Sequence, residues 1–396
     1  MTENLLSADF LLAGAPQRHA EYALLQGVNA VHRITLASGT TGWLVTGYQA
    51  VRRALTDPRL QGRTGAIGDG RKLPEDLRLG MNSQMLNQDP PDHTRLRRLI
   101  SSAFTRRRMD EMRPRIQQIT DELLDAMAGL DGVDLVQALA TPLPIRVLTE
   151  MLGVPDEQVD AFHGWTTALT ASARPRHELV TAGNEMLRYT RSLIELKREN
   201  PKPDLLSALV AVRDGEDRLT ENELTSMVFL LLIAGQETTV NLISNATLAL
   251  LSNPDQLQRL RAEPRLLPSA VEEFLRYESP VQAAMRYSTE EVNLAGVTIP
   301  AGSVVIVSLL GANRDPQRFA HADQLDLARK DNPQVAFGYG IHHCLGAPLA
   351  RLEGGIAISS LLARFPELRL DVPADSLNWR VSLIMHGLAE LPVRLN

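Results

Sequence analysis

The only cysteine of the chain, Cys344, stands near the C-terminus at the end of a glycine-punctuated stretch. That stretch runs from Phe337 to Gly346, and a helical pattern extends from Cys344 to about Arg364. A thiol at a helix N-terminus faces free backbone N–H groups and the positive end of the helix dipole, which favour the thiolate. Gly338 permits a tight turn, and Gly346 lets a flat group approach the backbone. A lone cysteine is most often a small buried apolar residue, but a thiolate presented in this way suits one axial bond to an iron held in a planar ring.

A carboxylate interrupts the most apolar helical stretch of the sequence, Leu224 to Leu251. Thr220 and Glu223 form a capping-box pattern at its start, and the segment Ala234–Thr239 (AGQETT) lies in its middle. A carboxylate in an apolar core is costly unless it is paired or its pKa moves, and a helix-interior glycine costs about 1 kcal/mol relative to alanine. Local rules broken together inside a core element indicate function. Proton delivery by Glu237 is the functional interpretation, and a partly exposed turn with Glu237 in water is the simpler one.

Two further motifs carry charged residues. Glu273 and Arg276 are three residues apart, and Ser279-Pro280-Val281, Arg286 and a β-like segment follow them. The same spacing occurs at Glu75/Arg78, Glu185/Arg188 and Glu195/Arg198, which are most simply surface ion pairs. In the segment from residue 89 to 97, His93 and Arg97 stand one helical turn apart. Each of these charges, taken alone, is most simply solvated.

Together the four motifs resemble those of the cytochrome P450 superfamily, the haem-thiolate monooxygenases. Phe337–Gly346 matches the haem-binding pattern F-G-x-G-x-H-x-C-x-G, and Ala234–Thr239 matches the oxygen-activation pattern A-G-x-[E/D]-T-[T/S]. Glu273–Arg276 matches E-x-x-R, and Asp89–Arg97 matches D-P-P-x-H-x-x-x-R. The motifs occur in the order found in the family, and the resemblance spans nearly the whole chain.

The resemblance implies haem b (iron protoporphyrin IX) as cofactor, with Cys344 as the metal ligand. Cationic donors are needed where the two propionates lie close to the hydrophobic ring. The implied cofactor-binding residues are His93, Arg97, Ala234, Arg286, Phe337, Gly338, His342, Cys344 and Gly346. The resemblance also implies that Glu273 and Arg276 form a buried structural pair, and Arg329 is our candidate for the arginine that joins it.

The implied catalytic residues are Glu237 and Thr238. Glu237 would feed protons from bulk water, and the Thr238 hydroxyl would hold dioxygen or the water beside it. Gly235 would widen the helix locally so that O2 fits. The implied activity is insertion of one oxygen atom of O2 into a substrate.

The expected substrate pocket is lined by small or aliphatic side chains. Its expected members are the Gly62–Met85 loop, the Trp165–His177 region, Ile233, Ala234, Thr239, Val281, Ala283, Ala284, Leu383 and Ile384. Such a lining suits a bulky apolar substrate: a polyketide, macrolide, terpenoid or steroid-like compound. The overall sequence resembles bacterial macrolide and polyketide hydroxylases.

Composition limits the partners and the compartment. Forty-one basic and 47 acidic residues give a net charge of −6, which argues against nucleic acid as the main partner. One cysteine excludes an internal disulfide framework. Residues 1–14 lack a signal-peptide pattern, and the strongest apolar run, Met227–Ala234, is too short to span a bilayer. We therefore expect a cytoplasmic protein without a membrane anchor.

The chain has no length to spare for a flavin or iron–sulfur domain. Under the family interpretation, electrons come from another protein, a ferredoxin with its NAD(P)H-dependent reductase. A basic cluster on the cysteine side could steer an acidic donor; it comprises Arg95, Arg97, Arg98, Arg106, Arg107 and Arg108.

The expected fold is mainly α with a small β portion, in a single catalytic domain over residues 1–396. It is the triangular helical prism of the P450 fold, with haem between the long central helix and the Cys-loop helix. A hairpin is expected at Val31–Leu36 and Trp43–Thr46, and a mobile loop at Arg59–Gln84. Other helices are expected at Tyr48–Leu55, Thr94–Ser102, Arg113–Ala128, Leu143–Leu152, Asp156–Leu169, Glu178–Arg198, Leu205–Val212 and Ser269–Tyr277, and strands at Val292–Leu294, Val297–Ile299 and Val304–Ser308.

Three other functions remain open at this point. A haem-thiolate sensor or carrier would use the same cysteine but would not need Glu237 and Thr238 on a core helix. A metal site at His342, His343 and Cys344 lacks an evident fourth ligand, and adjacent residues rarely close a tetrahedron. A helical interaction module would bind no haem.

Overall fold

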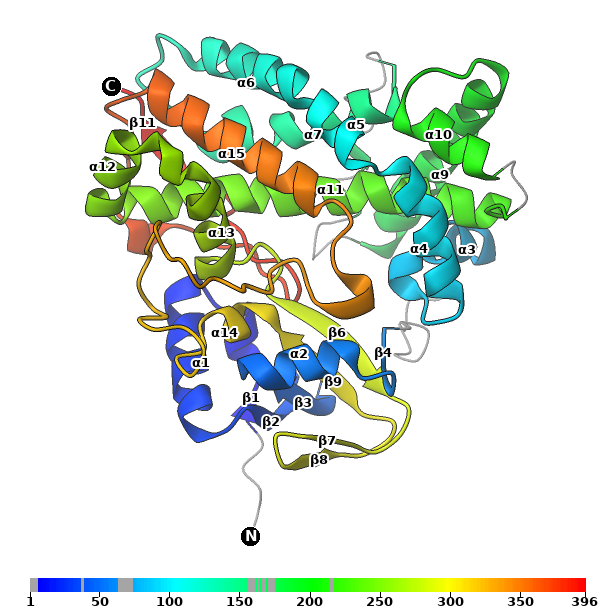
Figure 1. The fold of residues 1–396 in the computed structure, drawn as a ribbon, viewed down its shortest axis with the longest axis horizontal. Helices are drawn as coiled ribbons and strands as arrows, with labels where there is room; N and C mark the ends of the chain where they lie inside the picture. The colour runs from blue at the N-terminus through cyan, green and yellow to red at the C-terminus, as the bar shows by residue number, and fades with distance from the viewer. Residues whose placement is uncertain are drawn as a thin grey trace.

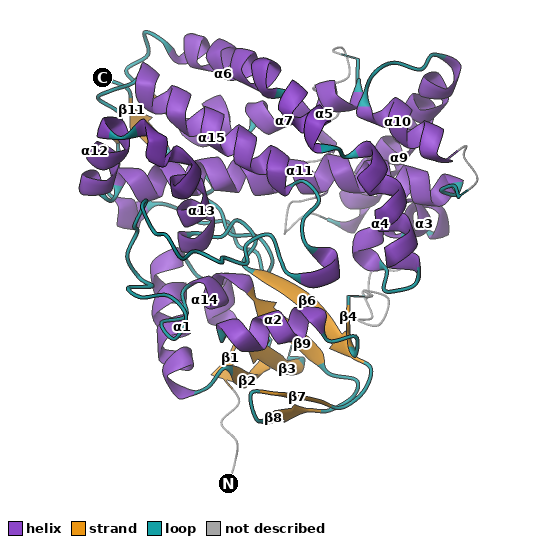
Figure 2. Ribbon diagram, in the orientation of Figure 1, coloured by secondary structure: helices purple, strands orange, loops and turns teal. Residues whose placement is uncertain are grey.

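Helices make up most of the protein, and the larger sheet lies toward one end of it (Figures 1 and 2). The structure, a computed structural model, describes residues 6–36, 39–62, 74–155, 161, 164–165, 169, 175–213 and 217–396. Most of the expected helix Asp156–Leu169, most of the Trp165–His177 region and residues 63–73 of the Gly62–Met85 segment lie outside these ranges.

The long helix α11 (Glu221–Leu251) runs through the centre of the helical part. The expected capping box is present, because the Thr220 side chain accepts from the Glu223 N–H and the Glu223 side chain accepts from the Thr220 N–H. The helix α15 (Ala347–Arg364) approaches α11 closely at Gly354, where a Cβ would lie 2.8 Å from Leu242 Cδ2 of α11. By length and composition α11 could cross a membrane, contrary to our expectation, but 61% of its most apolar window is buried inside the protein.

Several expected helices are present with small differences at their ends: α2 (Tyr48–Thr56), α4 (Asp92–Ala103), α6 (Arg113–Met127), α7 (Pro142–Leu152), α9 (Arg176–Glu199), α10 (Leu205–Arg213) and α13 (Leu267–Tyr277). The structure adds helices that were not expected: α1 (Ala15–Val28), α3 (Glu75–Asn82), α5 (Arg106–Glu111), α12 (Pro254–Ala262) and α14 (Leu309–Asn313). A π-helical turn, Val136–Ala140, precedes α7. Proline stands in the first turn of α6, α7, α12, α13 and α15, where its missing N–H has no helical acceptor to lose.

The expectation of a loop over Arg59–Gln84 is wrong for the described part of this segment. Its described part contains strand β4 (Leu60–Gln61) and helix α3, which packs against α9 and α11. Leu77 of α3 is fully buried, and a side chain at Gly80 would collide with Leu187 of α9. Tertiary packing therefore forms this helix, although its own sequence has weak helical periodicity.

The larger sheet joins strands that are distant in the sequence. Its order is β1 (Leu6–Ser7), β2 (Val31–Thr35), β3 (Thr41–Val45), β9 (Val304–Ser308), β6 (Ala283–Ser288) and β4. The predicted hairpin is confirmed by the antiparallel register Val31↔Val45 to Thr35↔Thr41. β3 runs parallel to β9, so the N-terminal hairpin is fixed to the segment that follows α13.

Two small sheets complete the structure. The predicted strands β7 (Val292–Leu294) and β8 (Val297–Ile299) pair with each other. β10 (Arg369–Leu370), β11 (Pro392–Arg394) and β5 (Gly132–Asp134) form a three-stranded sheet that brings the C-terminus to the helical part. The main apolar core surrounds α11, and a second one lies between α2 and the larger sheet. The Cys344 segment runs from the side of α2 to the start of α15, and so joins these two parts.

Candidate active site

The cysteine segment is a tight turn that places a thiol just before α15. Gly338 and Gly340 have φ angles of 74° and 77°, which side chains rarely adopt, and the Cys344 N–H donates to the Phe337 carbonyl at 2.9 Å. α15 begins at Ala347 with Gly346 as its N-cap, so the helix starts three residues later than expected. A Cβ at Gly346 would lie 3.9 Å from the Cys344 sulfur, the closest side-chain atom to it.

The pKa of the Cys344 thiol differs from the expectation in direction. The residue is exposed, yet enough protein surrounds the sulfur for desolvation to raise its pKa. Hydrogen bonds from the N–H groups of Gly346 and Ala347 and the charges of Arg97 and Arg351 lower the pKa, but by less in sum. The helix terminus alone therefore does not give a thiolate. A bound metal ion would, because a coordinating thiol is deprotonated.

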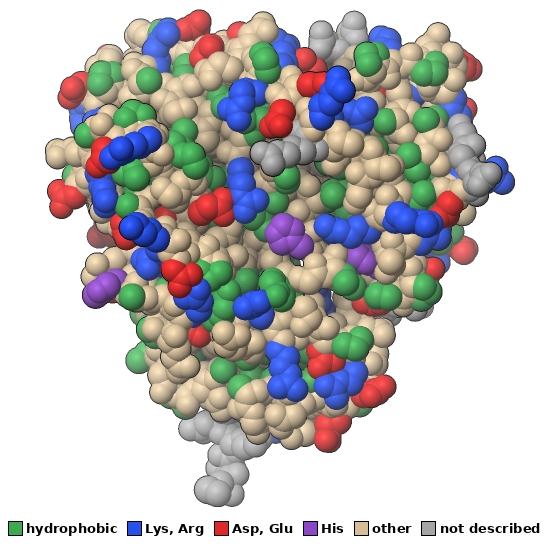
Figure 3. Space-filling model, viewed as in Figure 1, with side chains coloured by type: hydrophobic (Ala, Val, Ile, Leu, Met, Phe, Trp, Pro, Cys, Tyr) green, Lys and Arg blue, Asp and Glu red, His purple; other side chains and the backbone are tan. Residues whose placement is uncertain are grey.

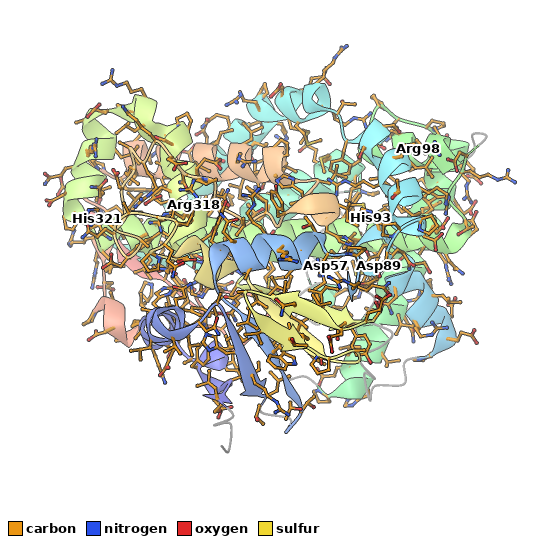
Figure 4. All side chains as sticks on the ribbon, turned by 60° about the horizontal axis from the view of Figure 1, so that its bottom comes forward. Asp57, Asp89, His93, Arg98, Arg318 and His321 are labelled. Atoms are coloured by element: carbon orange, nitrogen blue, oxygen red, sulfur yellow. The ribbon has the colours of Figure 1, made fainter. Side chains whose placement is uncertain are left out.

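One arginine and two histidines converge beside the cysteine segment. His93 on α4 is 1% exposed and neither ring nitrogen has a partner, and its ring centroid lies 4.3 Å from that of His342. A Cβ at Gly62 would lie 3.7 Å from Arg286 Nη1 and 3.8 Å from His342 Nε2. Desolvation lowers the pKa of all three groups, that of His342 to about 3. Figure 4 shows His93 next to Asp89, with Arg98 farther along α4.

These three groups have no ion-pair partner in the described part of the chain. Neither His93, Arg286 nor His342 forms an ion pair there, and Arg286 donates only to the Met285 carbonyl of its own strand, at 2.9 Å. The charge of Asp89 offsets part of the desolvation of His93 and Arg286. It forms no ion pair with either, since its Oδ1 accepts from the Gly62 N–H and its Oδ2 has no partner among the described residues. A buried, unpartnered donor is unfavourable, so the group of three fits an anionic ligand such as a pair of propionates.

α11 presents a polar turn toward this region. Ala234 is exposed in an otherwise largely buried helix. The Thr238 hydroxyl donates to the Ala234 carbonyl at 2.8 Å, and the Thr239 hydroxyl donates to the Gly235 carbonyl at 3.0 Å. α11 is α-helical throughout, so the local widening expected at Gly235 is wrong for this structure.

Glu237 is neither in water nor tightly paired. Its side chain is 12% exposed, and its Oε1 lies 3.7 Å from Arg380 Nη1. Desolvation raises the pKa of Glu237, and the Arg380 charge offsets part of that effect. The simpler interpretation, a solvated carboxylate, is therefore wrong, and a carboxyl with a raised pKa is suited to accept and release a proton.

The Glu-x-x-Arg pair is a buried structural network. Glu273 and Arg276 are both 0% exposed and form two hydrogen bonds of 2.8 Å each. Arg329 Nε lies 3.0 Å from Glu273 Oε2, so our candidate third member does join the pair. Arg276 also donates to three backbone carbonyls of the segment before the cysteine, those of Asn313, Ala322 and Gln324. Glu75 and Arg78, with the same spacing, are exposed and 4.0 Å apart.

The expected pocket residues differ in how deeply they are buried, and two of the segments that carry them are neighbours. Gln282 N–H donates to the Ile384 carbonyl at 2.8 Å and Val281 bridges to Met385, so the segments 281–284 and 383–385 lie side by side. Five members are half-buried: Ile233, Val281, Ala284, Leu383 and Ile384. Thr239 and Ala283, at 3% and 1% exposed, are more deeply buried than these five.

The sequence reasoning missed Arg351, Glu272 and Arg380. The Arg351 guanidinium lies 4.5 Å from the centroid of the Phe337 ring and is held by both Glu272 oxygens. Arg351 thus ties α15 and α13 to the cysteine segment. Glu272 adjoins the recognised Glu273, but a pairing across 79 residues has no local signal.

Comparison with known proteins gives a consistent assignment. The cytochrome P450 family model matches residues 145–388. "Cytochrome P450 107B1" of Saccharopolyspora erythraea is 50% identical over 391 residues, which is 96% of each protein. "Cytochrome P450 monooxygenase PikC" of Streptomyces venezuelae is 46% identical over 387 residues, which is 96% of this chain and 91% of PikC. The structure of the tirandamycin C-bound P450 monooxygenase TamI superimposes with a TM-score of 0.90 at 45% identity, over 99% of this chain and 100% of TamI. The chain therefore belongs to the cytochrome P450 family of haem-binding monooxygenases, and its fold is the P450 fold.

Proposed function

We propose that this P450 monooxygenase hydroxylates or epoxidises a bulky apolar natural product of the polyketide or macrolide type. Several relatives support that class by name: "6-deoxyerythronolide B hydroxylase" is 43% identical over 368 residues and "Mycinamicin IV hydroxylase/epoxidase" 41% identical over 378. The half-buried aliphatic residues of segments 281–284 and 383–385 suit a substrate with much apolar surface. A steroid-like substrate is the second candidate, because a "Vitamin D(3) 25-hydroxylase" is 46% identical over 384 residues.

The residues proposed to hold haem are those of the cysteine segment and the unpaired cations. Cys344 binds the iron, and His93, Arg97, Arg286 and His342 bind the propionates. The convergence of His93, Arg286 and His342 without an ion pair in the described residues is the observation that carries this assignment. When bound, haem supplies the activation of O2 from which one oxygen atom goes to the substrate.

Glu237 and Thr238 are proposed to manage the protons. The Thr238 hydroxyl proton is committed to the Ala234 carbonyl, so its oxygen is free to accept a hydrogen bond from water or from a protonated oxygen. The raised pKa of Glu237 makes that carboxyl better suited than a solvated one to take a proton from solvent and release it inward. A haem sensor or carrier would need neither group, so their presence together favours the oxygenase.

One spectrum tests the ligand assignment. The dithionite-reduced protein with CO should show the strongly red-shifted Soret band of a thiolate-ligated haem, and Cys344→Ala should lose it. A histidine-type band, or persistence of the band in Cys344→Ala, would refute Cys344 as ligand. A spin-shift screen with macrolactones and steroids then separates the two substrate classes.

A second test concerns Thr238. Thr238→Ala should bind substrate with an unchanged spin shift but release more of its electrons as hydrogen peroxide, because the acceptor for the relayed proton is lost. Thr239→Ala, whose hydroxyl bonds to the Gly235 carbonyl, is the matched control and should stay coupled. Coupled turnover in Thr238→Ala would contradict the role.

The electron donor is proposed to be a ferredoxin with its NAD(P)H-dependent reductase. Arg98 and Arg107, on α4 and α5, are exposed and available for an acidic partner, although each already contacts a carboxylate, Asp217 and Glu111. The Arg106 side chain lies outside the described atoms. On the face in Figure 3, basic and acidic side chains are interspersed, so the basic cluster is weaker in net charge than its sequence implies.

A further inference from the structure

A polar stripe on α11 faces the C-terminal segment 380–387. Glu237, Asn241 and Asn245 follow at intervals of four residues, so they share one face of the helix. Asn245 Nδ2 donates to the His386 carbonyl at 2.9 Å, and a side chain at Gly387 would collide with Asn241. Arg380 reaches Glu237 at the other end of the segment. The segment 380–387 therefore packs against this polar stripe of α11.

The segment is a closed and anchored loop. The Arg380 N–H donates to the Gly387 carbonyl at 2.9 Å, and the His386 N–H donates to the Pro280 carbonyl at 2.9 Å. The His386 ring stacks on Trp379 with centroids 4.5 Å apart, and its Nε2 lies 2.6 Å from Glu278 Oε2. These contacts fix the backbone from which the Arg380 side chain extends.

The Arg380–Glu237 contact is looser than the rest of the loop. At 3.7 Å it is an ion pair without a hydrogen bond, between a guanidinium that is 36% exposed and a carboxylate that is 12% exposed. Among the described residues, Arg380 is the one charged group that acts on the Glu237 carboxyl, and its charge opposes the effect of burial. The balance between the charged and the neutral carboxyl thus depends on where one half-exposed side chain lies.

We propose that Arg380 is a positioning residue that holds the Glu237 carboxylate charged and turned toward the segment 380–387, and so controls when this carboxyl takes up a proton. The proposal rests on the proposed function for the catalytic role of Glu237, but not for the contact itself. Leu383 and Ile384 lie on the same segment, so the side chains expected to touch substrate and the cation that holds the proton carrier share one backbone unit.

Infrared titration of the haem-loaded enzyme tests the contact directly. The protonated-carboxyl band that disappears in Glu237→Gln belongs to Glu237, and its pH midpoint is followed in the other variants. Loss of the positive charge in Arg380→Gln leaves desolvation unopposed, so the midpoint should move to higher pH. Arg380→Lys keeps the positive charge and should return the midpoint most of the way to its wild-type pH. Arg364→Gln, which removes another exposed, paired arginine, is the control and should leave the midpoint unchanged.

Wild-type enzyme provides a second measurement that needs no variant at position 380. Because Arg380 is half-exposed, added salt should screen its charge and raise the Glu237 midpoint. A midpoint that moves neither with salt nor in Arg380→Gln would overturn the proposal. If Arg380→Gln does not fold, the salt titration alone decides.

Oxygen consumption driven by ferredoxin and its reductase separates the two proposals. If the Glu237 midpoint shifts with Arg380 while Glu237→Gln consumes oxygen with the wild-type pH profile, Arg380 positions Glu237 but the catalytic role of Glu237 fails. If Glu237→Gln loses the pH profile and Arg380→Gln shifts it to higher pH together with the infrared midpoint, both stand. An altered profile in Glu237→Gln without any effect of Arg380 overturns the positioning role only.

Discussion

Two buried groups of charged side chains in this protein differ in where their partners lie. In the first, Glu273, Arg276 and Arg329 satisfy one another within the chain, and neither side chain of the Glu273–Arg276 pair is exposed. In the second, His93, His342 and Arg286 converge without an ion pair among the described residues, although the charge of Asp89 acts on His93 and Arg286. His93 is buried as fully as the Glu273–Arg276 pair, and Arg286 and His342 are half-buried, so burial alone does not separate structure from function.

The difference shows which buried charges call for a ligand. Removing a charge from water is unfavourable unless an opposite charge or several hydrogen bonds compensate. The chain itself compensates the first group, which then fixes the backbone that leads to Cys344. Asp89 compensates the second group only in part, so that group can accept an anion from elsewhere, and the propionates of haem are the anions that the family brings.

A third buried group could be mistaken for a ligand site. Ligand atoms of His19, Glu278 and His386 lie within 4.8 Å of one another, as in a metal centre. Arg18 contacts His386 Nδ1, and a guanidinium can only donate, so this nitrogen is the acceptor and Nε2 carries the proton toward Glu278. Arg314 lies 3.0 Å from the same Glu278. The His19–Glu278–His386 group is therefore paired within the chain, like Glu273, Arg276 and Arg329.

The largest expected effect comes from breaking the internally paired group. Arg276→Met leaves the Glu273 carboxylate buried with one main partner missing, and should lower the free energy of unfolding by about 3–5 kcal/mol. The measurement is thermal unfolding, with the yield of folded protein as a second readout. Arg78→Met removes the arginine of an exposed pair with the same spacing and should change stability by less than about 0.5 kcal/mol. Equal effects of the two variants would refute the distinction.

Glu353 on α15 sharpens the comparison, because this buried carboxyl has no charged partner among the residues that the structure describes. Its Oε2 is unpartnered, and desolvation raises its pKa to about 8. The folded-state pKa lies above the unfolded value, so stability is fullest below pH 4.5 and is lost as pH rises through 8. The loss should be on the order of 3 kcal/mol, and Glu353→Gln should abolish most of it.

Melting temperatures between pH 5 and pH 8.5 measure this dependence. Glu367→Gln, at an exposed position after the same helix, serves as control and should keep the wild-type slope. A Glu353→Gln curve parallel to the wild type would mean that the carboxyl finds a compensating partner in solution.

The ligand-dependent group should respond in a different observable. Arg286→Met removes one charge-assisted donor, worth about 1.5–3 kcal/mol, so haem should leave roughly 10–100 times faster. Haem transfer to apomyoglobin gives this rate. Arg286→Lys keeps a charge and should lie between the two. Unchanged haem release in Arg286→Met would place the propionates elsewhere.

Much of this arrangement could be predicted from local sequence signals. The capping box of α11 and the alternating strands each act over a few residues, so their elements were found. The helices α1, α3, α5, α12 and α14 were not. α1 buries Arg18 together with Tyr22 and Leu25, and a buried arginine interrupts the apolar periodicity by which a helix is recognised.

The residues of the site likewise divide into those that have a local sequence signal and those that do not. The motif positions around Cys344 and Glu237 were found because their spacing is fixed within one loop or one helical turn. The cations Arg351 and Arg380 were missed because their partners, Glu272 and Glu237, are brought to them by packing between distant elements. The backbone N–H groups beside Cys344 do lower its pKa as expected, but burial by the whole fold outweighs them, and that burial has no local sequence signal.

The smallest expected effect concerns cations that are exposed and already paired. Arg98→Ala with Arg107→Ala should raise the apparent KM for ferredoxin by about two- to threefold at low salt and leave it unchanged at high salt. The effect is modest because Asp217 and Glu111 already offset these charges. Arg265→Ala, an exposed arginine beside α12 and far from α4 and α5 in Figure 1, should have no effect at either salt concentration. A tenfold change in KM would mean that Arg98 and Arg107 leave their carboxylates to bind the donor. These two arginines would then resemble the group of His93, Arg286 and His342, which is completed by a ligand, and not the internally paired Glu273 and Arg276.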